Sequence, residues 1–194
     1  EMAPEALLPY LKRNAVENAT SVSATQTIAA FVRRADEVRF ALCSESLRTA
    51  KLPVGYALEI FPLSADEPYA KQVNGILAQT SAKIKLFVND DVCLTSPLAI
   101  EQLLRVFQDE TVGMAGILGS RSLPMNGNLL DAPDLRGGVY MPMKGDLEEI
   151  RFGSAAAEKF VEDVRFLCPS FFATQFDLAW DARYEGQYYA VLAH

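Results

Sequence analysis

The chain contains the stretch Lys83-Ile84-Lys85-Leu86-Phe87-Val88-Asn89-Asp90-Asp91-Val92. Its short apolar run, rich in bulky side chains, predicts a buried β-strand rather than a helix. The strand ends abruptly in one asparagine and two adjacent carboxylates. In an open α/β sheet, ligands sit just beyond the carboxyl ends of the strands. We therefore place this strand at the centre of the expected fold and its end at the first candidate site.

Two interpretations of Asn89, Asp90 and Asp91 are open from these residues alone. Oxygen ligands at a strand end suit Mg²⁺ or Mn²⁺ that bridges to a substrate diphosphate. The same residues also suit a polar turn that leads into the N-cap of the next helix. The rest of the sequence has to decide between a ligand site and a turn.

Composition limits the class of protein. The 194 residues favour a single core, since about 100–200 residues usually form one domain, and 50% hydrophobic with 22% charged residues is typical of a globular protein. The net charge of −7 argues against a nucleic-acid backbone as the main partner, although a nucleotide needs only a local cation or metal. The one histidine, His194, is the last residue, which argues against a histidine base or a histidine-ligated zinc.

The cysteines and the apolar runs bear on location. Cys43, Cys93 and Cys168 are odd in number, far apart and without a C-x-x-C pair, which is consistent with reduced cysteines in the cytosol. No apolar run approaches the ~20 residues that cross a bilayer. We expect a cytoplasmic protein without a transmembrane segment.

Strand and helix patterns alternate through the first two thirds of the chain. Ile28, Phe31 and Val32 recur at helical spacing, so residues 1–37 are expected to form a helical N-terminal extension, and residues 38–194 a single domain. In that domain we expect strands over residues 38–43 and 56–61, over the apolar run that begins at Lys83 and ends before Asn89, and over 112–118, with helices over 68–80 and after Pro97. This order predicts an α/β fold with a mostly parallel central sheet and helices on both faces.

The alternation stops after Gly119. Asn126-Gly127 and Gly137-Gly138 mark turns around an expected hairpin that includes residues 139–141. Two further strands are expected over residues 164–168 and 171–175, bent apart at Pro169.

Polar side chains follow three of the expected strands: Ser44 and Glu45, then Asp66, then the Asn-Asp-Asp run. The ends of parallel strands lie on one edge of a sheet, so we expect these groups to gather there. Carboxylates without a histidine suit a site for a divalent metal and a nucleotide, although loops without a ligand are polar too. Gly113 and Gly116 lie inside a strand pattern, so the dinucleotide-binding fingerprint is absent.

The chain resembles the glycosyltransferase-like family 2 group, whose members have the GT-A fold. The matching segments occur in the family's order and run from about residue 39 to 185: they are residues 86–92, Pro97 with its amphipathic helix, residues 112–116, Gly119-Ser120-Arg121, Leu123-Pro124, Asn126-Gly127, and residues 173–177 with Trp180.

This resemblance implies a nucleotide-diphosphate-sugar donor and a saccharide or other hydroxyl acceptor. Ser44, Glu45 and Asp66 are expected to hold the nucleobase and ribose. The family's D-x-D position falls on residues 89–91, which implies that Asn89 and Asp90 contact the donor and that Asp91 binds Mn²⁺ or Mg²⁺. Asn89 contributes no charge where many members have an aspartate, which implies weaker metal affinity.

The acceptor half departs from the family pattern. Cys168-Pro169 stands where related sequences carry Asp-Gly, and only Glu185 or Asp181 remains as the expected catalytic base. The chain ends where relatives continue with a helix and a strand. We expect either a piece of a longer protein or an incomplete catalytic half.

Two functions follow. The first is a metal-assisted glycosyltransferase. The alternative is a catalytically degenerate GT-A-like protein that binds a nucleotide, a carbohydrate or another protein.

Overall fold

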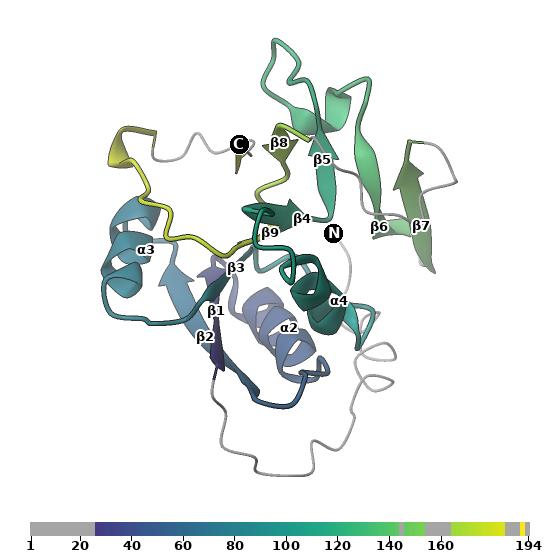
Figure 1. Ribbon diagram of the computed structural model, residues 1–194. Helices are drawn as coiled ribbons and strands as arrows, with labels where there is room; N and C mark the ends of the chain where they lie inside the picture. Colours follow the sequence, from purple (N-terminus) through teal and green to yellow (C-terminus); the bar gives the residue numbers. More distant parts are fainter. Residues whose placement is uncertain (1–25, 144–145, 154–163, 185–190, 193–194) are drawn as a thin grey trace.

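The computed structural model describes residues 26–143, 146–153, 164–184 and 191–192. Their strands form two five-stranded sheets with the orders β2-β1-β3-β9-β4 and β10-β8-β5-β6-β7 (Figure 1). The first sheet consists of β1 (Gln26–Arg34), β2 (Tyr56–Ser64), β3 (Ile84–Val88), β4 (Met114–Gly116) and β9 (Phe171–Thr174). The second consists of β5 (Leu118–Ser120), β6 (Arg136–Met143), β7 (Asp146–Phe152), β8 (Phe166–Leu167) and β10 (Val191–Leu192).

The prediction of a mostly parallel central sheet is not confirmed, because the first sheet is mixed. Strands β2, β1 and β3 are parallel, but β9 runs antiparallel to both β3 and β4, and the pairs of the second sheet are all antiparallel. The reason is that the segment β8–β9 pairs antiparallel along the segment β4–β5, and β9 keeps that direction where it lies beside β3. The α/β class itself is confirmed.

The predicted helix over residues 26–37 is wrong, because residues 26–34 form β1, an interior strand of the first sheet. Residues 28–32 are at most 1% exposed. Ile28 and Val32 face one core cluster while Ala29 and Phe31 face the other, so both sides of β1 are covered. A strand buried on both faces reads as a continuous apolar run in which the spacing of single residues is uninformative. Residues 1–25 of the expected extension lie outside the described residues.

The predicted strand over residues 38–43 is also wrong, because these residues belong to helix α2 (Glu37–Arg48). The Asp36 side chain caps this helix by accepting a hydrogen bond from the Arg39 amide at 2.9 Å. Glu37 lies in the first turn, where a negative charge is favoured by the helix dipole.

The other helices match the predictions. Helix α3 (Tyr69–Leu77) lies within the range expected over residues 68–80, and α4 (Ala99–Val106) follows Pro97. Helices α2 and α4 contribute side chains to the same core cluster, and α3 contributes to the other together with Trp180. Within the described residues no helix has both the length and the apolarity to cross a membrane.

Four phenylalanines stack in a row across the first sheet. Phe61, Phe31, Phe87 and Phe172 come from β2, β1, β3 and β9, and their successive ring centroids are 5.8, 4.9 and 4.7 Å apart. Burying stacked aromatic rings contributes both apolar area and ring–ring contacts. These stacked rings stabilise the register of β2, β1 and β3. The positions of their carboxyl ends relative to one another follow from that register.

The predicted strand over residues 112–118 is divided between the two sheets. Strand β4 belongs to the first sheet and β5 to the second, and β8 and β9 are divided in the same way at Pro169. Gly116 allows close approach here, because a Cβ atom on it would lie 3.2 Å from the Phe171 carbonyl oxygen. The predicted hairpin around residues 139–141 is confirmed as β6 and β7.

Candidate functional site

The candidate site lies where β1, β2 and β3 end. Arg34 is paired with Ser64, and Val32 with Val88, so these parallel strands end at the same edge of the sheet. The β1–α2 turn, residues 65–67 and residues 89–91 all leave from this edge (Figure 1). This is the edge at which open α/β sheets bind ligands.

Asp90 is part of the scaffold of this edge. Its side chain is buried, and Oδ2 accepts hydrogen bonds from the amides of Ala35 at 2.7 Å and Asp36 at 2.8 Å. The Arg39 Nε lies 3.8 Å from Oδ1. The Asp90 carboxylate therefore joins the end of β3 to the β1–α2 turn, and its expected contact with a donor would have to compete with these bonds.

Asp91, in contrast, is exposed at the same edge. Within the described part of the chain its side chain takes part in no hydrogen bond or ion pair. The neighbouring Asn89 is half-buried, and its amide nitrogen Nδ2 donates to the Ser170 hydroxyl at 3.4 Å. Of the three residues expected to meet the donor, Asp91 presents the free carboxylate.

Ser44 and Glu45 do not lie at a strand end, because they belong to the middle of α2. The Ser44 hydroxyl is buried and has no hydrogen-bond partner among the described residues, whereas the Glu45 side chain is exposed. Their expected role as nucleotide ligands depended on a strand over residues 38–43, but these residues belong to helix α2.

The end of β1 carries positive charge that the sequence analysis missed. Arg34 forms a two-point ion pair with Glu37, at 2.7 and 2.9 Å, which raises the pKa of the guanidinium, and it lies 5.6 Å from the Phe40 ring centroid. Arg33 is exposed and has no ion-pair partner within the described residues. With Arg39 in the first turn of α2, three arginines therefore lie beside the end of β3. The sequence signal was the Arg33-Arg34 pair directly after an apolar run.

Asp66 reaches the same edge from β2, and its side chain is exposed. The loop that carries it is held by Gln72 of α3, whose Nε2 donates to the carbonyl oxygens of Ser64 and Glu67, both at 2.9 Å. The Ser64 amide donates back to Gln72 Oε1 at 2.8 Å. The fold thus brings Asp66 and Asp91 to one edge.

Asp181 follows β9 in the chain, directly after Trp180, whose backbone is hydrogen-bonded to the Asn74 side chain of α3. It precedes the short helix η3 (Ala182–Tyr184), and both of its oxygens accept hydrogen bonds from the Arg183 side chain at 2.6–3.0 Å. The hydrogen bond from Arg183 lowers the pKa of Asp181. No hydrogen bond or ion pair between described residues joins Asp181 to the three strand ends. Glu185 lies outside the described residues.

The Cys168-Pro169 segment lies beside the candidate site. The carbonyl oxygen of Ser170, the next residue, accepts a hydrogen bond from the Asn89 amide at 2.9 Å. Cys168 is half-buried, and its amide donates to the Leu118 carbonyl at 2.9 Å. The position at which the resemblance implies Asp-Gly therefore adjoins the end of β3.

The residues at this edge fit one kind of metal site. Among the described residues no three or more His, Cys, Asp and Glu side chains gather closely enough to enclose a metal ion. A single free carboxylate at Asp91 suits Mg²⁺ or Mn²⁺ whose other ligands are substrate phosphates and water. An ion enclosed by protein ligands alone does not fit.

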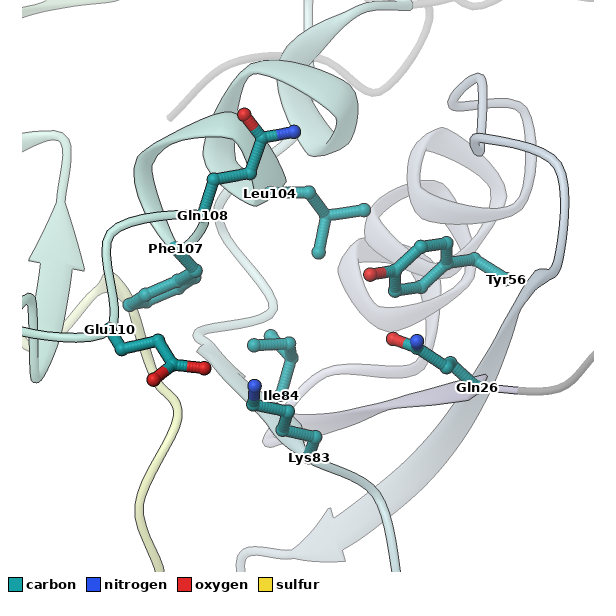
Figure 2. Close-up of a pocket in the computed structure, with 8 residues that line it drawn as sticks. All are labelled: Gln26, Tyr56, Lys83, Ile84, Leu104, Phe107, Gln108 and Glu110. Carbon is teal, nitrogen blue, oxygen red and sulfur yellow. The ribbon is translucent and has the colours of Figure 1, made fainter.

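A groove of about 200 Å³ lies at the opposite edge of the first sheet (Figure 2). Its floor is apolar, with Ile84, Leu104 and Phe107, and Lys83 and Glu110 stand on its rim (Figure 2). The groove is bordered by the beginnings of β1, β2 and β3, whereas ligands of open α/β sheets bind where the strands end. It is therefore separate from the candidate donor site.

Comparison with known proteins identifies the family. A search of curated proteins gave no significant match. The model of a family described as "Glycosyltransferase like family" matches residues 29–194, which includes most of β1, the ends of β2 and β3, and the second sheet. The match covers well over half of the chain, so the protein belongs to this glycosyltransferase-like family.

Proposed function

We propose that the protein transfers a glycosyl group from a nucleotide-diphosphate-sugar donor to a hydroxyl group of a saccharide or another acceptor. Membership of the family supports glycosyl transfer as the general activity. The observation that carries the finer proposal is the contrast between two adjacent residues. Asp90 is bonded into the protein, while Asp91 is exposed at the ligand-binding edge without a partner among the described residues.

In this proposal Asp91 holds Mg²⁺ or Mn²⁺. The ion would neutralise the diphosphate, which is the leaving group of the transfer. Arg33 stands at the end of the adjacent strand as an exposed cation, so it is placed to attract the same phosphates.

We assign the nucleoside to the β1–α2 turn and to Asp66, rather than to Ser44 and Glu45. The turn, residues 35 and 36, is held rigidly by Asp90, and the loop of Asp66 is held by Gln72. A fixed backbone orients a ligand without losing conformational entropy on binding. The carbonyl oxygen of the Asn89 side chain is suited to accept a hydrogen bond from a ribose hydroxyl.

We assign the role of general base to Glu185. A base must accept the proton of the acceptor hydroxyl, so a lowered pKa weakens it. Arg183 lowers the pKa of Asp181, which makes Asp181 the poorer of the two expected bases. Asp181 is better suited to hold Arg183 in place.

The test is the release of nucleoside diphosphate from a panel of nucleotide sugars, with Mn²⁺ and simple saccharide acceptors. We expect Asp91→Asn to lower the rate by about 100-fold or more, the scale on which one electrostatic contact to the developing charge is lost. Glu110→Gln, an exposed change at the opposite edge, should leave the rate unchanged. An unaltered rate in Asp91→Asn would contradict the assignment.

A second candidate function is supported by the segment beside Asn89. Cys168-Pro169 places no charge where the resemblance implies Asp-Gly in the acceptor half. A catalytically degenerate protein would bind a nucleotide sugar and release no product. Nucleotide binding without turnover of any nucleotide sugar in the panel would favour this binding function over the enzyme.

A further inference from the structure

Strand β7 forms an outer edge of the second sheet. Its residues pair with β6, and no other described strand pairs with its opposite side. Figure 1 shows β7 at the periphery of the molecule, on the far side of β6 from β5. An edge strand presents backbone N–H and C=O groups that can pair with a strand of another chain.

The side chains of β7 are mostly acidic and apolar. Asp146, Glu148 and Glu149 are exposed, and Ile150 is half-buried. The one cation is Arg151, whose Nε donates to Glu149 Oε1 at 2.8 Å on the same face of the strand. The strand contains no proline, and its charged side chains, which can block an edge, carry both signs and can therefore also pair across it.

The partner that fits this edge best is a second copy of the chain, paired in one particular register. Two identical strands related by a two-fold axis perpendicular to the sheet pair antiparallel, with one residue opposite itself on the axis. If Ile150 lies on the axis, Glu149 stands opposite Arg151 of the partner subunit, and Arg151 stands opposite Glu149 of the partner subunit. Two cross-strand pairs of opposite charge then add to the pairs within each strand.

The neighbouring registers are unfavourable. With Glu148, Glu149 or Arg151 on the axis, that charged side chain would face its own copy. Like charges directly opposite each other destabilise a strand pair, whereas opposite charges stabilise it. Of the registers centred on residues 148–151, the one centred on Ile150 therefore avoids a like-charge contact on the axis.

Exposed apolar side chains lie beside the edge. Tyr140 and Met141 of β6 pair with Glu149 and Glu148, and they are 50% and 44% exposed. In a dimer β6 would be the second strand away from the partner's β7. The Tyr140 and Met141 side chains could therefore cover part of the partner's strand. A strand pair alone buries less than the ~800 Å² per partner of a standard stable interface. A reversible dimer that depends on concentration follows.

We propose that β7 pairs antiparallel with β7 of a second copy, with Ile150 on the two-fold axis, so that the second sheets of two subunits form one continuous sheet. This interaction is independent of the donor site and of the proposed transferase activity.

Cysteine cross-linking tests the register. In the proposed pair the two Ile150 side chains are directly opposite, with Cβ atoms about 4.5–5.5 Å apart. We expect Ile150→Cys to form a disulfide-linked dimer under mild oxidation. Glu148→Cys is the matched control, because its two copies would lie about 13 Å apart along the strands. The unaltered chain controls for its own three cysteines. Equal cross-linking of both variants, or of neither, would overturn the proposal.

Charge reversal tests the interface without a disulfide. Glu149→Arg and Arg151→Glu each create like-charge contacts, so we expect each to weaken the dimer by about tenfold or more in Kd. The double exchange restores opposite charges both within and between strands, and should return the Kd to about the original value. Sedimentation equilibrium measures these constants, and melting temperatures check that the variants fold. A monomer at all concentrations, or single variants that dimerise like the original chain, would overturn the proposal.

Discussion

At the scale of single residues, Asp90 and Asp91 are adjacent in sequence but differ in what they contact. The buried Asp90 carboxylate accepts two backbone hydrogen bonds, whereas Asp91 is exposed. The polar-turn interpretation therefore applies to Asp90, whereas the ligand site at Asp91 is our proposal.

This contrast predicts different effects on stability. Asp90→Ala leaves the amides of Ala35 and Asp36 without their acceptor, so we expect the free energy of unfolding to fall by about 2–3 kcal/mol. Asp91→Ala is the control and should change it by less than about 0.5 kcal/mol. Urea unfolding measures both. Similar losses in the two variants would mean that Asp91 also has a structural role.

Asp134 predicts a pH dependence. Its carboxylate accepts hydrogen bonds from the hydroxyls of Ser120 and Ser122 and from the Arg121 amide, and the Ser120 hydrogen bond is the largest cause that lowers its pKa to about 2. Because the folded pKa lies below the ordinary aspartate value of 3.8, the unfolded chain binds more protons. This contribution to stability is complete above the unfolded pKa and is lost as the pH falls through the folded pKa.

The measurement is the free energy of unfolding of the original chain and of Asp134→Asn at several pH values from 5 down to about 2, the folded pKa. The original chain should lose more stability with acid than the variant does, so their difference should shrink as the pH falls. Parallel curves would show that Asp134 is not the group responsible.

At the scale of elements, the sequence predicted those with a clear period. Strand β3 and helices α3 and α4 match because a short bulky run, or apolar residues at helical spacing, decided them. Strand β1 was missed because it is buried on both faces, which removes the alternation of a half-buried strand. Helix α2 was missed because residues 38–43 alternate in polarity as strand residues do, although Asp36 is a suitable N-cap for a helix.

The wrong predictions for β1 and α2 also affected the candidate site. With a strand expected over residues 38–43, Ser44 and Glu45 were expected at the first strand end, whereas β1 ends at Arg34. The edge formed by Asp66 and Asp91 was predictable, because both follow strands that were identified correctly. The bonding of Asp90 to the β1–α2 turn was not, because it joins residues 54 and 55 positions apart in the sequence.

Two glycines test the elements separately. Gly137 of β6 has φ +117°, and a Cβ atom on it would lie 1.9 Å from the Ile117 carbonyl oxygen. We expect Gly137→Ala to destabilise the protein by more than about 2 kcal/mol. Gly75 of α3 has open space around it, so Gly75→Ala should stabilise the protein by about 0.5–1 kcal/mol. Thermal unfolding compares them, and a tolerated Gly137→Ala would contradict the close approach of β6 to residue 117.

At the scale of the whole molecule, the two sheets supply different parts of the account. The parallel strands of the first sheet bring Arg33, Asp66 and Asp91 to one edge. The second sheet is joined to it at two places, between β4 and β5 and between β8 and β9, and the second connection touches the end of β3 through Ser170. Ser170, which follows β8, therefore adjoins the candidate site at the end of β3.

The central claim is that Asp91 and the neighbouring strand ends bind a nucleoside diphosphate through a divalent metal. The most direct measurement is thermal unfolding with a panel of nucleoside diphosphates, each with and without Mn²⁺. A ligand at about 100 times its Kd adds about 2.7 kcal/mol, a shift of several degrees for a domain of this size. We predict a shift for at least one nucleoside diphosphate with Mn²⁺, absent without the metal and absent in Asp91→Ala. A shift of the same size in Asp91→Ala, or no shift with any nucleotide, would contradict the account.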